Sequence, residues 1–272
     1  MPKNLTPTQV QAYRDDGFVF AVPVLSRAEA TEYRRRYESL DGIQKDDRDG
    51  SMTLSIKPHL VYPWIDELVR HPVLLDAVED LIGPDILLFS DSFIVKEPMT
   101  EGVFSMHQDG WRWKLEPMEM VHCWLAFTDS TAVNGCVKVV PRSHLRGERE
   151  HEFIKTKENV ISYGQTVVDV DPAAAVDLVL GAGEMSIHDT YAVHASGPNR
   201  TNDRRIGFSM RFMSTRVKAL GGPRNSATLV RGVDRHGNWE LEPSPRADLD
   251  PACLPFHKEL VARHAPFGFQ FL

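Results

Sequence analysis

The pattern of hydrophobic and polar positions divides the chain into a helical first part and a strand-rich remainder. Within residues 1–85, capping residues mark the helix starts: Thr6 precedes Pro7, and Ser26 is followed three positions later by Glu29. Glycine and proline mark the predicted helix ends. The helices are predicted over residues 7–16, 26–40, 64–70 and 72–82, with a last one over 254–263.

Short extended runs separated by turn residues follow residue 85. The dipeptide Asn134-Gly135 is typical of a tight turn. Short strands with glycine and proline between them are typical of a sandwich, a jelly roll or a barrel. The strands are predicted over 87–96, 120–127, 136–140, 184–188 and 205–213. We therefore expect a mainly antiparallel β core covered by helices.

Alternation along the strands gives two of them unlike faces, because successive side chains point to opposite sides. In 205–212 the even positions are all apolar, and the odd positions are Arg205, Gly207, Ser209 and Arg211. In 87–96, the residues Ser90, Ser92 and Lys96 lie opposite Leu87, Phe89, Phe93 and Val95. A polar face fits a barrel interior that holds a ligand, and it fits a solvent-exposed sheet equally well. Alternation alone leaves both interpretations open.

No internal repeat or linker divides the chain, so residues 1–272 are expected to form a single domain. Its parts would be a helical cover over about 1–85, a core over about 86–215 and a C-terminal extension over about 216–272. The polar stretch 41–57 reads as a surface loop or as a lid over a site, since long loops in compact domains are often functional.

Composition limits the partners. A net charge of −7 and a pI near 5.9 argue against nucleic-acid binding, which needs a basic face. Cys123, Cys136 and Cys253 form no CxxC pair and suit a reducing compartment. We see neither a signal peptide nor an apolar run long enough to span a membrane. A soluble, cytoplasmic protein that acts on a small molecule is expected, and its oligomeric state is not indicated.

The H-x-D motif at His107-Gln108-Asp109 is the first candidate for chemistry. In an extended segment, positions i and i+2 point the same way, so the imidazole and the carboxylate can meet one ion. Two histidines and a carboxylate on one face of an octahedron are typical of non-haem iron oxygenases. The second H-x-[DE], at 257–259, lies in a predicted helix where the two side chains diverge, so the motif is informative only at a strand end.

A second histidine must lie downstream, and His188 and His194 both qualify by position. We favour His194, which begins a turn and precedes Arg205 by eleven residues. An arginine supplies the fixed fork of donors that a 2-oxo acid's free carboxylate needs. Ser196 adds a hydroxyl on the same side.

Taken together, these segments resemble the phytanoyl-CoA dioxygenase family over about residues 5–215. The resemblance rests on the segments His107-Gln108-Asp109, Asn134-Gly135-Cys136, Pro141-Arg142-Ser143-His144 and His194-Ala195-Ser196-Gly197-Pro198-Asn199 with Arg205. It implies a double-stranded β-helix, a cupin-like jelly roll. It departs from many relatives at Met106, where they have Trp, and at Arg142, where the usual residue is Gly.

The same resemblance implies the cofactors and the residues that hold them. Iron(II) would be bound by His107, Asp109 and His194, and Arg205 would anchor the co-substrate 2-oxoglutarate. The positions that line the 2-oxoglutarate pocket in relatives are here Ser196, Lys96 and Trp124. Halogenating relatives lack the carboxylate ligand, which this chain has, so hydroxylation with dioxygen is expected.

Four further residues are candidates for substrate binding: Trp111, Trp113, His122 and Arg211. The two tryptophans share the parity of His107 and Asp109 if the extended conformation continues past Gly110. They would then form a wall of the substrate site, and the alternative is that they are core aromatics.

The predicted function is that of an iron(II)- and 2-oxoglutarate-dependent dioxygenase hydroxylating an unactivated C–H bond of a small metabolite or natural-product intermediate, with release of succinate and CO2. The same oxidation chemistry also serves desaturation, ring formation or rearrangement. Two alternatives of another class are a zinc-type hydrolase, which would activate water with the same ligands, and a non-catalytic jelly-roll binding module.

Overall fold

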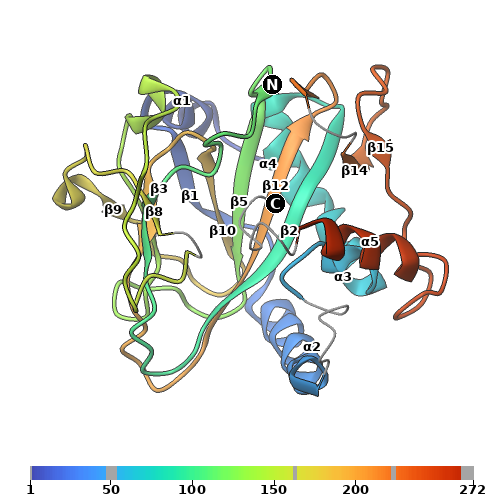
Figure 1. The fold of residues 1–272 in the computed structure, drawn as a ribbon, viewed down its shortest axis with the longest axis horizontal. Coiled ribbons are helices and arrows are strands. Elements are labelled where there is room, and N and C mark those ends of the chain that lie inside the picture. The colour runs from blue at the N-terminus through green and yellow to red at the C-terminus, as the bar shows by residue number, and fades with distance from the viewer. Residues whose placement is uncertain (1, 47–53, 162–163, 222–224, 265–272) are drawn as a thin grey trace.

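Two β-sheets form the body of the protein (Figure 1). The computed structural model describes residues 2–46, 54–161, 164–221 and 225–264. The large sheet has the order β1 (Phe18–Pro23), β10 (Glu184–Asp189), β5 (Met120–Ala126), β12 (Arg205–Ser214), β2 (Ile86–Lys96), β14 (Ser226–Arg231) and β15 (Glu240–Leu241). The small sheet has the order β3 (Phe104–His107), β11 (His194–Ser196), β6 (Val137–Val139) and β9 (Val176–Asp177). The pairing is antiparallel except between β14 and β15. The predicted jelly-roll core is thereby confirmed.

Shorter elements connect these sheets. Two further ribbons pair β13 (Lys218–Ala219) with β4 (Leu115–Glu116), and β7 (Glu152–Phe153) with β8 (Gln165–Thr166). The helices are α1 (Pro7–Asp16), α2 (Arg27–Asp46), α3 (Pro63–Val69), α4 (Pro72–Ile82) and α5 (Leu254–His264), with 3-10 turns η1 (Pro58–Leu60), η2 (Ser143–Arg146) and η3 (Pro172–Ala174). Figure 1 shows α3 and α4 behind the large sheet.

The predicted helix starts are confirmed by their caps. Thr6 and Gln9 form a reciprocal capping box at α1, and Ser26 and Glu29 exchange the same bonds at α2. The predicted end of the second helix at residue 40 was wrong, because α2 continues to Asp46. Gly42 follows two residues after Leu40 but lies inside α2, where a glycine lowers helix propensity without ending the helix.

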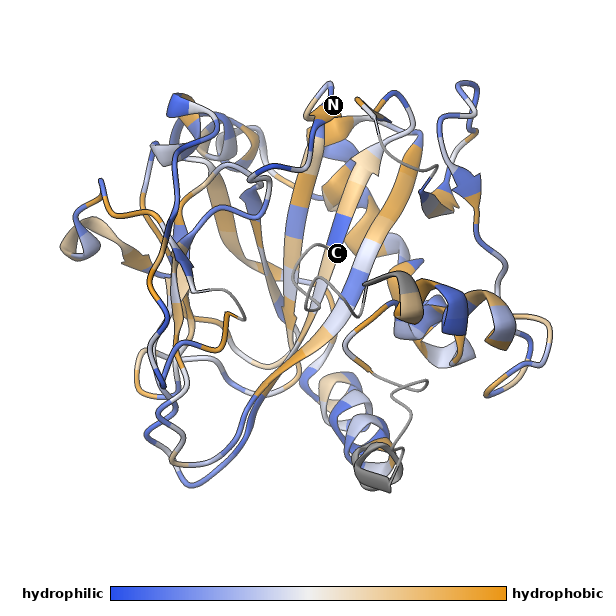
Figure 2. Ribbon diagram, viewed as in Figure 1, coloured by the Kyte–Doolittle hydropathy of each residue, from blue (hydrophilic) through white to orange (hydrophobic). Residues whose placement is uncertain are grey.

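The hydrophobic core lies between the large sheet and the helices. The even residues of β12, Ile206, Phe208, Met210 and Phe212, are fully buried against side chains of α3 and α4. The odd residues Arg205 and Ser209 are also buried but face the barrel interior and line a cavity. Figure 2 shows hydrophilic bands crossing the otherwise hydrophobic central strands. The polar face of β12 is therefore the inside of the barrel, not solvent-exposed sheet.

The predicted face of β2 was partly wrong, because the strand contains a β-bulge. Arg211 pairs with Ser90 and Phe212 pairs with Leu88, which leaves Phe89 as the additional residue. Phe89 and Leu87 consequently pack in a separate cluster around Trp239, apart from the main core that contains Phe93.

Four of the described strands, β1, β13, β14 and β15, lie outside the predicted core of residues 86–215. Residues 18–23, within the predicted helical cover, form β1 and pair with β10, while residues 226–231 form β14 beside β2. Of the polar stretch 41–57, residues 41–46 belong to α2 and 47–53 lie outside the described residues, so the lid stays a prediction. Among the helices described, none combines the length and apolar character needed to cross a membrane.

Candidate active site

The H-x-D motif lies where β3 ends and faces a cavity inside the barrel. His107 is the last residue of β3, and Asp109 follows in the next turn. Between them, Gln108 is buried, and its side-chain amide donates to Gly147 O at 2.8 Å and Tyr191 O at 2.6 Å. These bonds fix Gln108, which lines the same cavity as His107 and Asp109.

His194 is the cross-strand partner of His107. It begins β11, which pairs with β3, and the two imidazole centroids lie 4.1 Å apart. Each ring donates its Nδ1 proton to a backbone carbonyl two residues earlier, His107 to Ser105 O at 2.7 Å and His194 to Ala192 O at 3.0 Å. Burial lowers the pKa of His107 to about 3 and that of His194 to about 4. Both rings are thus neutral with the Nε2 lone pair available, as in histidines that bind metals.

Asp109 belongs to a group of four residues whose candidate ligand atoms all lie within 4.8 Å of one another. Its members are Asp109, His122, His188 and His194. His107 is not in that group, although it lines the same cavities. An imidazole and carboxylate donor set of this kind fits iron(II).

The two additional histidines differ in how their nitrogens are engaged. His122 donates from Nδ1 to Asp109 Oδ2, and its Nε2 accepts from Ser209 Oγ at 2.6 Å. The Nε2 of His188 lies 3.7 Å from Asp109 Oδ2, and neither ring nitrogen of His188 makes a hydrogen bond. Both ring nitrogens of His122 therefore make hydrogen bonds, whereas those of His188 make none.

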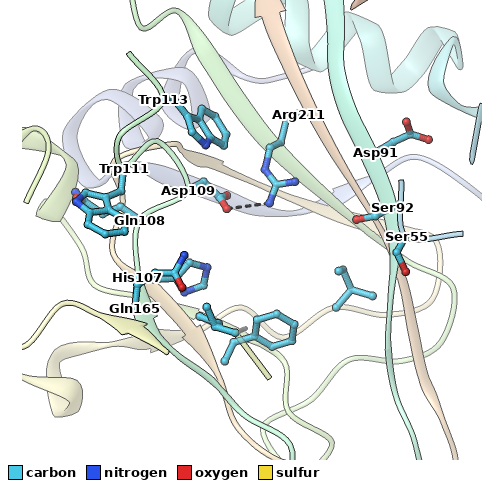
Figure 3. Close-up of a pocket in the computed structure, with 13 residues that line it drawn as sticks. Ser55, Asp91, Ser92, His107, Gln108, Asp109, Trp111, Trp113, Gln165 and Arg211 are labelled. Atoms are coloured by element: carbon cyan, nitrogen blue, oxygen red, sulfur yellow. Dashed lines mark hydrogen bonds and ion pairs between the residues drawn. The ribbon is translucent and has the colours of Figure 1, made fainter. Parts of the chain in front are cut away.

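The Asp109 carboxylate is held ionised by its neighbours. Burial by itself raises the pKa of a carboxyl group, but Arg211, His122 and His194 outweigh it and hold the pKa of Asp109 well below its usual range. Arg211 Nη2 donates to Asp109 Oδ1 at 2.8 Å (Figure 3). Asp109 can consequently bind a cation without first losing a proton.

A second cavity, of about 70 Å³, is lined by members of this cluster and by three of the predicted co-substrate residues, Arg205, Ser196 and Trp124. Arg205 is 1% exposed and donates from Nη1 to Gly135 O at 2.6 Å, while its Nε and Nη2 have no hydrogen-bond partner. Lys96, the cross-strand partner of Arg205, donates to Gly102 O at 2.7 Å. Among the described residues no carboxylate forms an ion pair with Arg205 or Lys96. Two buried cations without a counterion fit an anionic ligand.

Ser196 and Trp124 complete this pocket. The Ser196 hydroxyl and the Trp124 Nε1 are buried without a hydrogen-bond partner. The Arg205 guanidinium lies 4.8 Å from the Trp124 ring centroid. The indole explains why Gly207 interrupts the polar face of β12, because a Cβ there would lie 1.9 Å from Trp124 Cζ2.

Another cavity, of about 120 Å³, shares His107, Asp109 and Arg211 with the 70 Å³ cavity. Trp111, Trp113 and Arg211 line it together with polar side chains of β2 (Figure 3). Arg112 and Lys114 have φ values of 61° and 51°, so two non-glycine residues adopt the left-handed conformation beside the tryptophans. Such backbone strain concentrates at functional sites.

The predicted site residues line these two cavities, except Lys96, which lies across the strand pair from Arg205. His122, predicted to contact substrate, belongs to the group of four and also lines the 70 Å³ cavity. His188, the alternative to His194 in the sequence, also belongs to this group, whereas Ser209 was not among the predicted site residues. The alternation Val121, His122, Cys123 along β5 puts His122 on the interior face next to Trp124, and that pattern was available in the sequence. The contact between His122 and Asp109, 13 positions apart, was not.

Comparison with known proteins gives one family match and several relatives. A family model described as phytanoyl-CoA dioxygenase matches residues 13–207. The apo structure of the non-heme monooxygenase ThoJ superposes with a TM-score of 0.81 at 33% identity, covering 95% of this chain and 96% of that one. A probable phytanoyl-CoA dioxygenase of Caenorhabditis elegans is 24% identical over 76% of this chain and 75% of its own length. A probable alpha-ketoglutarate-dependent hypophosphite dioxygenase of Stutzerimonas stutzeri is 26% identical over 72% and 66%.

These alignments do not extend over the whole of every relative. For two of the curated relatives, from Caenorhabditis elegans and Mus musculus, they cover 75% and 48% of the relative's length. The match with ThoJ, by contrast, covers nearly all of both chains.

Proposed function

Since the chain belongs to the phytanoyl-CoA dioxygenase family, we propose that it hydroxylates an unactivated C–H bond of a small metabolite or natural-product intermediate. Its class is that of an iron(II)- and 2-oxoglutarate-dependent dioxygenase, so the reaction consumes dioxygen and releases succinate and CO2. One arrangement carries the proposal: neutral His107 and His194 beside ionised Asp109, next to the uncompensated cations Arg205 and Lys96.

In this proposal His107, Asp109 and His194 hold the iron. Their shared orientation toward the cavity and the free Nε2 atoms of the two histidines support this choice. Bound iron(II) with 2-oxoglutarate supplies the activation of dioxygen for attack on a C–H bond. The carbonyl acceptors on Ser105 and Ala192 keep both rings in the required tautomer.

Arg205 and Lys96 bind the co-substrate's distal carboxylate. The guanidinium offers two unpaired nitrogens on adjacent sides, the geometry for a bidentate carboxylate pair. Ser196 has an unpartnered hydroxyl that would add a third donor, and Trp124 closes the pocket opposite Gly207. Burial of these groups excludes water from the bound diacid.

The substrate occupies the 120 Å³ cavity next to His107 and Asp109. Trp111 and Trp113 form its apolar wall, and Trp113 is supported by Phe89 at 5.3 Å between ring centroids. Desaturation, ring formation or rearrangement uses the same residues and differs only in the bond that the substrate presents.

We place the enzyme in the cytoplasm, acting on a free small molecule and not on nucleic acid or a membrane. The net charge of −7 disfavours polyanions. The three cysteines are buried free thiols, which suits a reducing compartment.

The test is turnover of 2-oxoglutarate with iron(II), ascorbate and dioxygen. We expect succinate and CO2 from the wild type, a loss of both with a chelator, and a loss in His194→Ala and Arg205→Met. Arg216→Met, which removes an exposed arginine paired with Glu119, is the charge-matched control and should behave as the wild type. A zinc hydrolase would consume no 2-oxoglutarate, and a binding module would turn over nothing.

Substrates can be sought in the same assay. A metabolite panel incubated with the loaded enzyme should contain one compound that gains a single oxygen atom by mass spectrometry, and only in the presence of 2-oxoglutarate. Loss of two hydrogens without oxygen gain would identify desaturation or ring formation instead.

A further inference from the structure

Both oxygens of the Asp109 carboxylate accept hydrogen bonds from side chains of the large sheet. Arg211 Nη2 donates to Oδ1 at 2.8 Å, and His122 Nδ1 donates to Oδ2. His122 is itself fixed by Ser209, whose hydroxyl donates to Nε2 at 2.6 Å. Since Asp109 is nearly buried, these are charge-assisted bonds in a water-poor site.

The two donor residues lie in β-strands, whereas Asp109 lies in a turn. Arg211 in β12 and His122 in β5 are direct cross-strand partners in the middle of the large sheet. Asp109 lies in a turn after β3 of the small sheet. The pair of donors thus connects the turn that carries the carboxylate to the opposite sheet.

We propose that Arg211 and His122 are positioning residues that fix the Asp109 carboxylate for metal binding. The inference rests on the proposed function and goes beyond it, because it removes both residues from the substrate-binding set. It also accounts for His122 within the metal cluster without making it a ligand, since both of its nitrogens are already engaged. Partners that orient a ligand in this way typically change metal affinity by about 10–100-fold when removed.

A competing explanation gives the opposite sign. If Arg211 merely neutralises Asp109 until a metal arrives, the guanidinium competes with the metal, and its removal would tighten metal binding. A positioning role requires that removal weaken binding. The direction of the affinity change therefore separates the two.

The experiment measures Co(II) binding to the apo protein by calorimetry, together with the visible spectrum of the Co(II) complex. We expect Arg211→Met and His122→Phe each to weaken binding by about 10–100-fold, with band positions unchanged because the ligands remain. His122→Asn places an amide nitrogen near the position of Nδ1 and should restore part of the affinity. Arg216→Met is the charge-matched control and should bind as the wild type does.

Unchanged or tighter binding in Arg211→Met would overturn the proposal. So would a His122→Asn variant no better than His122→Phe, or a Co(II) spectrum altered by loss of His122, which would make His122 a ligand. Thermal melts of each apo variant show whether it is folded, and His122→Asn remains informative if His122→Phe is not. Failure of the wild type to bind Co(II) would refute the proposed function itself, which distinguishes the two failures.

Discussion

At the scale of single residues, the choice of metal ligands depends on the hydrogen-bond partner of each histidine's Nδ1. His107 and His194 share one device, a backbone carbonyl two residues earlier that accepts from Nδ1. The Nε2 of His188 lies 3.7 Å from Asp109 Oδ2, against 3.9 Å for His194, yet no acceptor fixes the tautomer of His188. A histidine ligand needs one ring nitrogen with its lone pair oriented toward the metal. Of these three rings, only those of His107 and His194 have their tautomer fixed by a backbone carbonyl.

Alanine substitution should separate these histidines. His107→Ala should weaken Co(II) binding by more than about 100-fold, beyond the range of an outer-shell change, whereas His188→Ala should cost about 10-fold or less. Calorimetric titration of the two apo variants measures this directly. A larger loss in His188→Ala than in His107→Ala would place His188 in the ligand set.

Lys96 predicts a proton-linked step in co-substrate binding. Burial, aided by the charge of Arg205, lowers the pKa of Lys96 to about 7. A bound carboxylate favours the charged ammonium and raises that pKa, so binding above pH 7 must take up a proton. Affinity for 2-oxoglutarate should be highest below pH 7 and fall as pH rises. Calorimetry in buffers of different ionisation enthalpy measures the uptake, and Lys96→Met should abolish it.

At the scale of elements, local signals predicted helices better than sheets. Thr6, Ser26 and the glycines following helices act within a few residues, so the starts of α1 and α2 could be predicted. The alternation of β12 likewise predicted its two faces. The bulge at Phe89 and the pairing of β1 with β10 depend on partners far along the chain, which no local pattern contains. The H-x-D motif of the candidate site is a local pattern and could be predicted. The contact of Asp109 with His122 is not local and could not.

A buried charge network ties the C-terminal extension to the barrel. Glu242 contacts Lys57 Nζ and accepts from Thr228 Oγ1 at 2.6 Å, and His59 Nδ1 lies 2.5 Å from Asp91 Oδ1. Asp91 also lines the proposed substrate cavity. The network therefore joins η1, β2 and the segment after β15 behind one wall of that cavity.

Breaking this network should destabilise the protein. Glu242→Gln leaves Lys57 without its carboxylate, while His59 keeps Asp91, and loss of one partner of a buried ion pair typically costs about 3–5 kcal/mol in the free energy of unfolding. Denaturant unfolding measures the loss. The exposed Glu240→Gln, two residues away, is the matched control and should change stability by less than about 0.5 kcal/mol.

The same network predicts how stability depends on pH. Burial lowers the pKa of His59, but Asp91 and Glu242 outweigh it and raise that pKa to about 9. Its contribution is complete below the unfolded value of about 6.5 and is lost as pH rises through 9. Burial raises the pKa of Glu242, but Lys57 and His59 lower it to about 2. That contribution is complete above pH of about 4.5 and is lost toward pH 2. Glu242→Gln should flatten both limbs of a stability–pH profile.

At the scale of the whole molecule, stability and function lie on opposite faces of one sheet. The outer face of β12 packs Phe208 against Phe93, with 4.7 Å between ring centroids, beneath the helices. The inner face carries Arg205, a buried guanidinium without a carboxylate partner among the described residues. Burying an unpaired charge is unfavourable, so the buried Arg205 opposes folding while the outer face favours it.

This division makes opposite predictions for two residues three positions apart. Arg205→Met removes the uncompensated cation and should leave the apo melting temperature equal or higher, but abolish the stabilisation by 2-oxoglutarate. In the wild type with Co(II), that stabilisation should reach about 2.7 kcal/mol at a ligand concentration 100 times Kd. Phe208→Ala should lower stability by about 3–5 kcal/mol and keep the ligand-dependent increment. Thermal melts of the wild type, Arg205→Met and Phe208→Ala, each with and without 2-oxoglutarate, test both predictions. An Arg205→Met variant that melts well below the wild type would show that the guanidinium supports the fold, and the separation of the two faces would fail.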